Sequence, residues 1–418
     1  MAIKVLMLGW ELPPYHSGGL GRACEGMTRG LSGQGVNVSF VLPKKLPGAQ
    51  YDWMIVYDAS EYAMSDPPGN PAGAEACLET VAKQQCALTR GYAAVPGAAL
   101  CSSCFSELSG HLAHIGIYAR GVLAVAERQS FSAIHAHEWM TFPAAILARE
   151  VAARQGRKVP FIAHVHATEI DRHDGATIYN IEKQGLQAAD RIIAVSEHTK
   201  SVITTYYDID PNKISVLHNG IEPRQPAVQP RHALKRRHKL VLFLGRVTYQ
   251  KGPDYYVRVA KQVTDRYPKV KFLMVGSGDM QASMMEMAAA MDLTGKLLFN
   301  SWLRDHDTDK AYQMADVFVM PSVSEPFGLG PLEAIQNGTP VIVSKNSGVV
   351  EVVKNCVAVD FWDIEQMASA ILKLLEDEKY AKDMVLRAQD EIKYLTWDRA
   401  VRKLLGIYDQ AAKGVAHA

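Results

Sequence analysis

The sequence predicts an α/β fold organised as two domains. Short apolar runs alternate with segments in which apolar residues recur at helical spacing, a pattern typical of parallel sheets covered by helices. With 418 residues, the chain is too long for one typical hydrophobic core and suits two. Three prolines between residues 222 and 230 indicate a stiff linker, so we expect one domain over residues 1–222 and the other over 223–396.

Composition argues against several classes of protein. The formal net charge is +1 with 21% charged residues, so no global electrostatic bias indicates nucleic-acid binding. The apolar run at residues 3–8 is too short for a transmembrane helix or a signal peptide, and no later run approaches the roughly 20 residues that cross a bilayer. We therefore expect a soluble, cytoplasmic protein without a nucleic-acid partner or a transmembrane segment.

A glycine-rich loop follows the first predicted strand. The strand at residues 3–8 ends at Gly9, and a helix runs to Gly33 after a turn that contains Gly18 and Gly19. Glycines at this place would let the backbone approach a phosphate closely, as in dinucleotide-binding folds. The spacing is not that of the G-x-G-x-x-G motif, so an ordinary flexible loop is the alternative.

The segment from residue 58 to 110 differs from its surroundings. It follows a second strand at residues 36–42, is rich in alanine and proline, and is interpreted as an insertion in the first domain. Its cysteines are Cys77, Cys86, Cys101 and Cys104. Zinc ligation, redox chemistry and simple burial of the thiols are all open, and the wide spacing of the first pair favours burial.

Histidines alternate along two further strands of the first domain. His135 and His137 end one strand and are followed by Glu138, and His164 and His166 end the next. Because successive side chains of a strand point to opposite faces, at least half of these histidines should face a core or support other residues. A zinc site is the less favoured interpretation, because no HExxH-like motif accompanies them.

The second domain begins with an apolar strand at residues 240–244. Arg246 and Lys251 flank the turn at its carboxyl end, where a guanidinium and an ammonium suit a diphosphate that gains charge as it leaves. Two basic residues in a loop are unremarkable by themselves. Further on, Asp305 and Asp307 form a D-x-D pattern, which we interpret as the capping of a helix that begins near Thr308 rather than as a metal site.

The stretch from residue 315 to 343 predicts a strand, a loop, a helix and another strand. Glu325 lies in the loop and Glu333 about one turn inside the helix, so both can face the edge where parallel sheets bind ligands. The loop supplies backbone N–H groups that favour a phosphate, and carboxylates accept sugar hydroxyls, so the expected ligand is a nucleotide sugar. The alternative is that both glutamates merely stabilise the start of the helix.

The motif EPFGLGPLE and the pattern GR-x4-KG resemble those of retaining glycosyltransferases of family four, close to the glycogen and starch synthases. The Gly18-Gly19-Leu20 loop and the segments HAHEW and HVHATE resemble the same group, although His16 replaces its usual Lys and Glu138 its usual Asp. The resemblance implies the GT-B architecture, with two facing Rossmann-like domains and a C-terminal helix, 397–418, that crosses back to the first domain.

The resemblance also implies roles for individual residues. The cations would bind the donor diphosphate, Glu325 the sugar hydroxyls and Glu333 the ribose. His166 would bind the transferring sugar, and Glu138 would lie near the acceptor. The implied catalytic residues are Arg246, Lys251, Glu325, His166 and Glu138. The implied donor-binding residues are Gly18, Gly19, Phe327, Gly328, Leu329, Gly330 and Glu333.

The expected activity is transfer of glucose, with retention of configuration, from ADP-glucose or UDP-glucose to a soluble α-glucan. No metal or other cofactor is implied, and a homo-oligomer is left open. The main alternative is a cell-envelope or lipid-directed hexosyltransferase, such as a mannosyltransferase using GDP-mannose. A phosphorylase would have a much longer chain and a lysine motif for pyridoxal phosphate, and a catalytically silent homologue would lack one of the four key charges.

Overall fold

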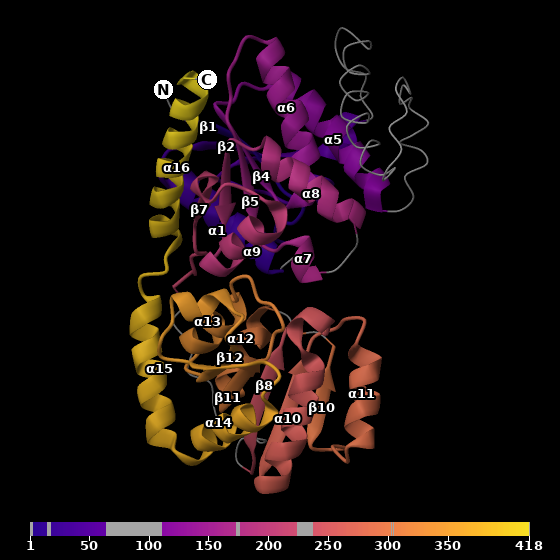
Figure 1. Ribbon diagram of the computed structural model, residues 1–418, viewed down its shortest axis with the longest axis vertical. Helices are drawn as coiled ribbons and strands as arrows, with labels where there is room; N and C mark the ends of the chain where they lie inside the picture. The colour runs from indigo at the N-terminus through magenta and orange to yellow at the C-terminus, as the bar shows by residue number, and fades with distance from the viewer. Residues whose placement is uncertain are drawn as a thin grey trace. The chain divides into compact units, whose positions relative to one another are not determined.

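The computed structural model describes residues 3–14, 18–63, 111–172, 176–223, 237–301, 303 and 305–417. The chain divides into two compact units (Figure 1). Unit 1 comprises Met1–Val195, Thr199–Gly220 and Trp397–Ala418, and unit 2 comprises Ser196–His198 and Ile221–Thr396. His16, the four cysteines between 77 and 104, and most of the predicted insertion and linker lie outside the described residues.

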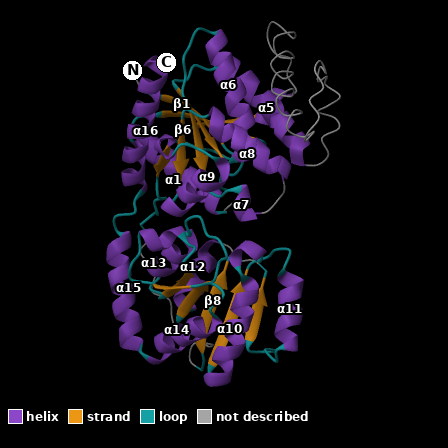
Figure 2. Cartoon of the chain, in the orientation of Figure 1, coloured by secondary structure: helices purple, strands orange, loops and turns teal. Residues whose placement is uncertain are grey.

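Unit 1 is built on a parallel sheet of seven strands in the order β3-β2-β1-β4-β5-β6-β7. The strands are β1 (Lys4–Leu8), β2 (Asn37–Leu42), β3 (Ile55–Asp58), β4 (Ala133–His137), β5 (Phe161–Val165), β6 (Arg191–Ala194) and β7 (Ile214–Val216). Helices cover the sheet on both faces (Figure 2), which accounts for the burial of every residue of β4 and β5.

The described helices of unit 1 are α1 (Gly19–Gly33), α2 (Ala59–Ala63), α5 (His111–Arg128), α6 (Phe142–Arg154), α7 (Glu169–Arg172), α8 (Ala176–Ala188), α9 (Glu197–Tyr207, in unit 1 from Thr199) and α16 (Trp397–His417). Two short 3-10 helices, η1 (Trp139–Thr141) and η2 (Pro211–Lys213), join them. Helices α5, α6 and α8 pack with one face of the sheet, and α1 and α16 with the other.

Helix α16 fits closely against α1 because two glycines leave room for it. A Cβ atom added to Gly26 would lie 2.1 Å from the ring of Trp397, and one added to Gly30 would lie 2.8 Å from Val401 Cγ2. Trp397, Val401, Leu404 and Tyr408 are all buried in this layer. These four side chains on the last helix therefore complete the core of unit 1.

Unit 2 contains a second parallel sheet, with six strands in the order β10-β9-β8-β11-β12-β13. The strands are β8 (Lys239–Leu244), β9 (Val270–Val275), β10 (Leu297–Asn300), β11 (Val317–Met320), β12 (Val341–Ser344) and β13 (Val357–Val359). Both sheets are parallel and helix-covered, so the predicted α/β class is confirmed.

The described helices of unit 2 are η4 (Tyr249–Lys251), α10 (Pro253–Arg266), α11 (Gln281–Ala290), α12 (Asp305–Met314), α13 (Leu329–Gln336), η5 (Gly348–Glu351), α14 (Ile364–Glu376) and α15 (Glu378–Ile392). Helices α10 and α14 pack with the buried side chains of β8, β9, β11 and β12 in one core. Across the described residues of both units, no helix combines the length and the apolar character needed to span a membrane.

Candidate functional site

In unit 2, three loops leave the carboxyl ends of neighbouring strands. Strands β8, β11 and β12 are adjacent and parallel, so the loops that follow Leu244, Met320 and Ser344 lie along one edge of the sheet. Parallel α/β sheets bind ligands at this edge. The predicted residues Arg246, Lys251 and Glu325 all lie on these loops.

Two glycines shape the edge. Gly252 has a left-handed φ of 64°, and a Cβ atom there would lie 2.1 Å from the carbonyl oxygen of Pro321, so the loops after β8 and β11 approach closely only because this residue lacks a side chain. Gly328, with φ of 102°, precedes helix α13, and a Cβ atom there would lie 3.2 Å from Ser347 Oγ and 3.3 Å from Glu325 Cγ, so its constraint is mainly the backbone conformation. Both positions therefore disfavour any other residue.

Lys251 and Glu325 form an ion pair between the two loops. The side chains are 18% and 9% exposed, and Ser322 Oγ lies 3.4 Å from the same carboxylate oxygen. The backbone of Glu325 is also held: its N–H donates to the carbonyl of Asn346, and its carbonyl accepts from the N–H of Gly348, both at 2.9 Å. The pair is thus a fixed, largely desolvated feature of the edge, where electrostatic interactions are stronger than in water.

Arg246 presents a second cation at this edge and is exposed. Its Nη2 atom donates to Oε1 of Gln250 at 3.1 Å, and the carbonyl of Gln250 accepts from the N–H of Val323 at 3.0 Å. Gln250 is buried and connects Arg246 to the loop that carries Glu325. The hydrogen bond to Gln250 therefore fixes one end of the guanidinium, and the other N–H groups of Arg246 can donate to a ligand.

Helix α13 begins at Leu329, directly after Gly328, and its start supplies backbone N–H groups of the kind that can bind an anion. Glu333 lies one turn inside and is half-buried, and its Oε2 accepts from the hydroxyl of Tyr312 at 3.1 Å. Phe327 is buried, and Leu329 and Gly330 are partly exposed. The structure therefore brings the predicted donor-binding loop and Glu333 onto the same short segment, beside Glu325.

The D-x-D pattern lies elsewhere in unit 2. Helix α12 begins at Asp305, three residues before the predicted start near Thr308, so Asp307 is in its first turn. Asp307 pairs with Lys310 at 3.0 Å, and Asp309 Oδ1 accepts from Nδ2 of Asn337 at 3.1 Å. The two aspartates therefore lie within the helix and do not cap it, so the predicted capping role is wrong, although acidic residues in a first turn stabilise a helix.

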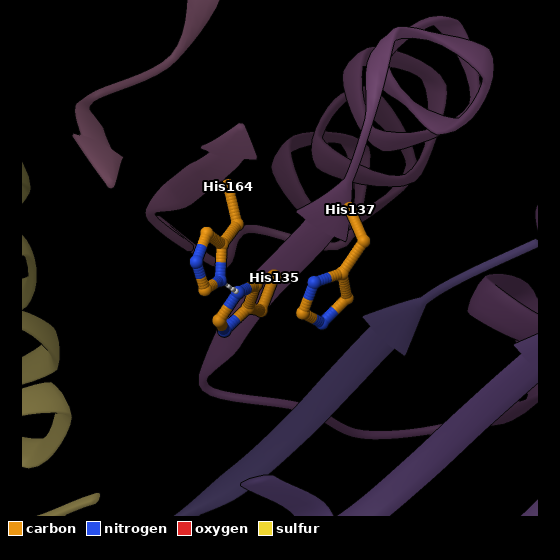
Figure 3. A group of neighbouring side chains, drawn as sticks. All are labelled: His135, His137 and His164. Atoms are coloured by element: carbon orange, nitrogen blue, oxygen red, sulfur yellow. Dashed lines mark hydrogen bonds between the residues drawn. The ribbon is translucent and has the colours of Figure 1, made fainter. Parts of the chain in front are cut away.

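In unit 1, the histidines of β4 and β5 form one cluster on the face covered by α16. Strand register places His137 opposite His164. His135, His137 and His164 are fully buried and His166 is half-buried, so the prediction that at least half of these side chains face inward is confirmed. Figure 3 shows the three buried rings lying beside one another at the ends of their strands.

Ring nitrogens connect the cluster. His135 Nδ1 lies 2.6 Å from the hydroxyl of Tyr408 on α16, and His135 Nε2 lies 3.1 Å from His164 Nδ1. His137 Nδ1 lies 3.0 Å from Nε2 of His166. Burial lowers the pKa of His135 to about 3 and places those of His137 and His164 well below 6.5, with neighbouring imidazoles adding to the effect. The three buried rings are therefore neutral at pH 7.

Three of these histidines could offer ligands to a metal ion, because one ring nitrogen from each lies within 4.8 Å of the others. Tetrahedral zinc with Zn–N bonds of about 2.0 Å brings its nitrogens to roughly 3.3 Å from one another. The rings of His135 and His137 are instead stacked, with centroids 4.5 Å apart and an interplanar angle of 21°. His135 and His164 are hydrogen-bonded to each other. The arrangement fits a hydrogen-bonded array better than a metal centre.

Glu138 follows the cluster and points inward. Its carboxylate is buried and accepts from the backbone N–H groups of His166 at 2.7 Å and Ala167 at 3.1 Å. Its backbone has φ of 68° and ψ of 157°, a region that costs a non-glycine residue on the order of 1–3 kcal/mol. Glu138 thus holds the turn that carries His166, a role that the sequence did not predict. Its predicted place near an acceptor stays a prediction.

Gly18 and Gly19 lie at the start of helix α1, where Gly18 is the N-cap and Gly19 the first helical residue. A Cβ atom on Gly18 would lie 3.0 Å from Oε2 of Glu11. A helix start has backbone N–H groups without partners in the helix, so the predicted role of Gly18 and Gly19 in binding a phosphate stays a prediction.

Sequence reasoning missed a buried carboxylate on helix α8. Glu182 on α8 is fully buried, and its Oε2 accepts from the hydroxyl of Tyr207 and from the N–H of Glu169. Burial is the main cause that raises the pKa of Glu182 to about 8. The available signal was a glutamate directly after Ile181 and one turn before Leu186, within a segment whose apolar residues recur at helical spacing.

Comparison with known proteins places the chain among glycosyltransferases. The family model described as "Glycosyl transferases group 1" matches residues 225–391, and that described as "Glycosyltransferase Family 4" matches residues 89–225. An uncharacterized glycosyltransferase of Methanocaldococcus jannaschii is 26% identical, with 97% of this chain and 98% of that protein covered.

Two further relatives have named activities. A D-inositol 3-phosphate glycosyltransferase of Salinispora tropica is 29% identical, with 73% of this chain and 69% of that protein covered. A glycogen synthase of Mycobacterium tuberculosis is 24% identical over 99% of this chain and 96% of that protein.

Solved structures share the fold over nearly the whole chain. Sucrose-phosphate synthase from Thermosynechococcus elongatus superposes with a TM-score of 0.71 at 18% identity, covering 98% of both chains. Anabaena HepE in complex with UDP-glucose has a TM-score of 0.71 at 16% identity, covering 98% of this chain and all of that one. At these identities the likeness establishes the fold alone.

Proposed function

Because the chain belongs to the group 1 glycosyl transferases and has the GT-B fold, we propose that it transfers a hexose from a nucleoside diphosphate sugar with retention of configuration. The observation that carries the proposal is the edge of unit 2, where Lys251, Glu325 and Arg246 lie on adjacent loops. Two cations beside a carboxylate suit a ligand with a diphosphate and a sugar.

The cations stabilise the departing diphosphate. Lys251 and Arg246, with the backbone N–H groups at the start of α13, interact more strongly with the diphosphate as its charge grows in the transition state. Because that interaction increases along the reaction, it lowers the barrier for cleavage of the bond between C1 and the phosphate oxygen. Glu325 accepts hydrogen bonds from the sugar hydroxyls, and Glu333 accepts from the ribose.

Retention follows from attack on the face that the leaving group occupies. The bond from C1 to the diphosphate oxygen breaks, and the acceptor oxygen bonds to C1 on the same side. The acceptor's proton passes to the departing phosphate oxygen, so charge and atoms balance without a protein nucleophile. In unit 1, His166 donates to the transferring sugar, and the start of α1 at Gly18 and Gly19 contributes donors to the diphosphate.

The proposed sugar is glucose and the proposed acceptor an α-glucan. The full-length match to a glycogen synthase supports this choice, as do the Gly18-Gly19-Leu20, HAHEW and HVHATE segments. Helix α16 and both sheets are within the matched range of that relative. ADP-glucose and UDP-glucose are both proposed as donors, and the Anabaena structure with UDP-glucose supports a glucosyl nucleotide in this fold.

A second acceptor class has its own support. The D-inositol 3-phosphate glycosyltransferase is slightly more identical to this chain than the glycogen synthase, although a smaller share of the chain matches it. A small phosphorylated polyol is therefore the runner-up acceptor, ahead of a lipid or cell-envelope acceptor with GDP-mannose as donor.

A donor and acceptor screen tests the proposal. The purified protein is incubated with ADP-glucose, UDP-glucose or GDP-mannose, alone and with glycogen or inositol 3-phosphate, while release of nucleoside diphosphate is measured. We expect release from a glucose donor that increases with glycogen, and an α-anomeric product by NMR. Activity only with inositol 3-phosphate, or only with GDP-mannose, would replace the substrates, and a β-anomeric product would overturn retention.

The proposed reaction uses no metal ion. Lys251 and Arg246 supply the positive charge that a divalent cation supplies in other phosphate chemistry. We therefore expect full turnover after dialysis against excess EDTA. Loss of activity that manganese or magnesium restores would contradict this part of the mechanism.

A further inference from the structure

His166 is held from two sides by a pair of adjacent residues. Its backbone N–H donates to the buried carboxylate of Glu138, and its ring Nε2 lies 3.0 Å from Nδ1 of His137. Strand register sets this arrangement, because His137 at the end of β4 lies opposite His164, two residues before His166. The position of the His166 backbone and the state of its ring are therefore both determined by residues 137 and 138.

The hydrogen bond between His137 and His166 allows two assignments of protons when both rings are neutral. In the first, His137 carries its proton on Nδ1 and donates to Nε2 of His166, which then carries its own proton on Nδ1. In the second, His166 donates from Nε2, and His137 must carry its proton on Nε2. The two assignments give His166 opposite hydrogen-bonding character at Nδ1.

The surroundings of His137 distinguish the two. Among the described residues, Nε2 of His137 is fully buried and has no hydrogen-bond partner. The second assignment would place an N–H donor there without an acceptor, which is the rarer arrangement in folded proteins. The first leaves only an unshared lone pair at that nitrogen. The first assignment is therefore the more stable one.

A charged His137 would remove this distinction, since both of its nitrogens would then donate. Burial, with the neighbouring imidazoles, places the pKa of His137 well below 6.5, so its ring stays neutral at pH 7. No cation is needed to connect the two rings. The hydrogen bond between His135 and His164 likewise joins two neutral rings, and the other nitrogen of His135, Nδ1, contacts the hydroxyl of Tyr408.

We propose that His137 is a positioning residue, which donates from Nδ1 to Nε2 of His166 and so fixes His166 with its proton on Nδ1. His166 is thereby a hydrogen-bond donor toward an oxygen acceptor, such as a hydroxyl or a phosphate oxygen of a nucleotide sugar. The role of the His166 Nδ1–H group in catalysis rests on the proposed function, but the assignment of the proton to Nδ1 does not.

The first test measures the proton directly, in the full chain without substrate. Long-range proton–nitrogen NMR spectra of protein with nitrogen-15-labelled histidine distinguish a protonated from a bare nitrogen in each ring, and the His166→Asn variant identifies the His166 signals. We expect Nδ1 protonated and Nε2 bare in His166, and the same in His137. A proton on Nε2 of His166 would overturn the proposal, whatever the outcome of the donor screen.

A matched pair of variants then tests the donor. In His137→Asn the side-chain amide nitrogen stands near the place of Nδ1, whereas in His137→Gln it stands near that of Nε2. We expect His137→Asn to keep the His166 assignment and most of the turnover. His137→Gln should lose the assignment and lower kcat roughly tenfold or more, with a smaller change in KM.

Thermal unfolding of both variants controls for damage to the fold, since both place an amide in the same buried position. Equal loss of kcat in the two variants, at equal stability, would show that the donor at Nδ1 has no role. A metal ion bound stoichiometrically to the purified protein and released in both variants would also overturn the proposal, because a metal-bound His137 nitrogen cannot donate.

Discussion

The charged pair of unit 2 and the histidine cluster of unit 1 differ in how they are stabilised. In unit 2, Lys251 and Glu325 are charged, lie on loops, and hold each other through an ion pair. In unit 1, His135, His137 and His164 are neutral, lie at strand ends, and are held by hydrogen bonds between rings. The geometry of the first group depends on the attraction between opposite charges, and that of the second on which ring nitrogens carry protons.

This difference predicts how each group responds to substitution. A charge that loses its partner in a partly buried place is destabilising and also changes the electrostatic field at the site. A hydrogen bond between neutral groups contributes less to stability, and its loss mainly changes the orientation of the neighbouring ring. The predictions below test that distinction, and they begin with the largest effect.

Replacing Lys251 with Met should reduce turnover by roughly 10²-fold or more, because it removes a cation that stabilises the transition state. It should also lower the free energy of unfolding by about 3 kcal/mol, since Glu325 keeps a buried charge without a partner. Steady-state kinetics and denaturant unfolding measure the two effects. The double variant with Glu325→Gln should recover stability but not activity. Wild-type turnover in a folded Lys251→Met protein would refute a catalytic role.

Replacing Arg246 with Ala should also reduce turnover by roughly 10²-fold, but without loss of stability. Arg246 is exposed, and its hydrogen bond goes to the neutral side chain of Gln250, so the substitution leaves no charge without a partner. Arg258→Ala is a matched control, because Arg258 is exposed on α10 and pairs weakly with Asp254. The two variants should unfold alike, within about 0.5 kcal/mol of wild type, and differ in kcat. Equal activity of the two would remove Arg246 from the site.

Acid should destabilise unit 1 through its histidines. The pKa of His135 is about 3 in the folded protein and near 6.5 when unfolded, so the unfolded chain binds the extra proton and stability falls as pH drops below 6.5. This one residue contributes about 1.4 kcal/mol per pH unit in that range. Thermal unfolding between pH 7 and pH 5 measures the slope, which His135→Asn should reduce.

Glu182 makes stability depend on pH in the opposite direction, because its contribution decreases as pH rises. Its folded pKa of about 8 lies above its unfolded value, so its contribution is complete below pH 4.5 and is lost as pH rises through 8. The Glu182→Gln variant should therefore show a weaker decline in unfolding temperature on the alkaline side. An unchanged acid slope in His135→Asn, or an unchanged alkaline slope in Glu182→Gln, would mean that these groups are not buried as described.

The smallest effect is expected for Tyr408→Phe. It removes the hydroxyl that lies 2.6 Å from Nδ1 of His135, and it should lower the free energy of unfolding by about 1–2 kcal/mol with little change in kcat. Tyr394→Phe is the control, since Tyr394 is 67% exposed in unit 2. A large loss of kcat in Tyr408→Phe would show that the histidine array acts on the reaction as a whole rather than through His137.

The fold and the unit 2 loops could be predicted from sequence because their signals are local. Each strand is a short apolar run, and the loops after β8 and β11 carry their glycines and charges within a few residues of the strand end. The ion pair of Lys251 and Glu325 joins residues 74 positions apart, yet both motifs are recognisable separately. Their proximity then follows from the adjacency of two parallel strands.

The details of unit 1 could not be predicted in the same way. Alternation along β4 and β5 showed that histidines face inward, but which ring nitrogens meet depends on the register between the strands and on Tyr408, which lies 273 positions after His135. The inward turn of Glu138 depends on a positive φ that its residue type gives no reason to expect. Glu182 lacked any motif, and only its place on an apolar helix face marked it.

Helix α16 has a consequence for the order in which the protein is made. It supplies part of the core of unit 1, yet all but three residues of unit 2 lie before it in the sequence and after the rest of unit 1. On the ribosome, the first unit to begin synthesis is therefore the last whose core can be completed. Until residues 397–417 emerge, the face of α1 that contains Gly26 and Gly30 has no partner helix and can contact chaperones or another nascent chain.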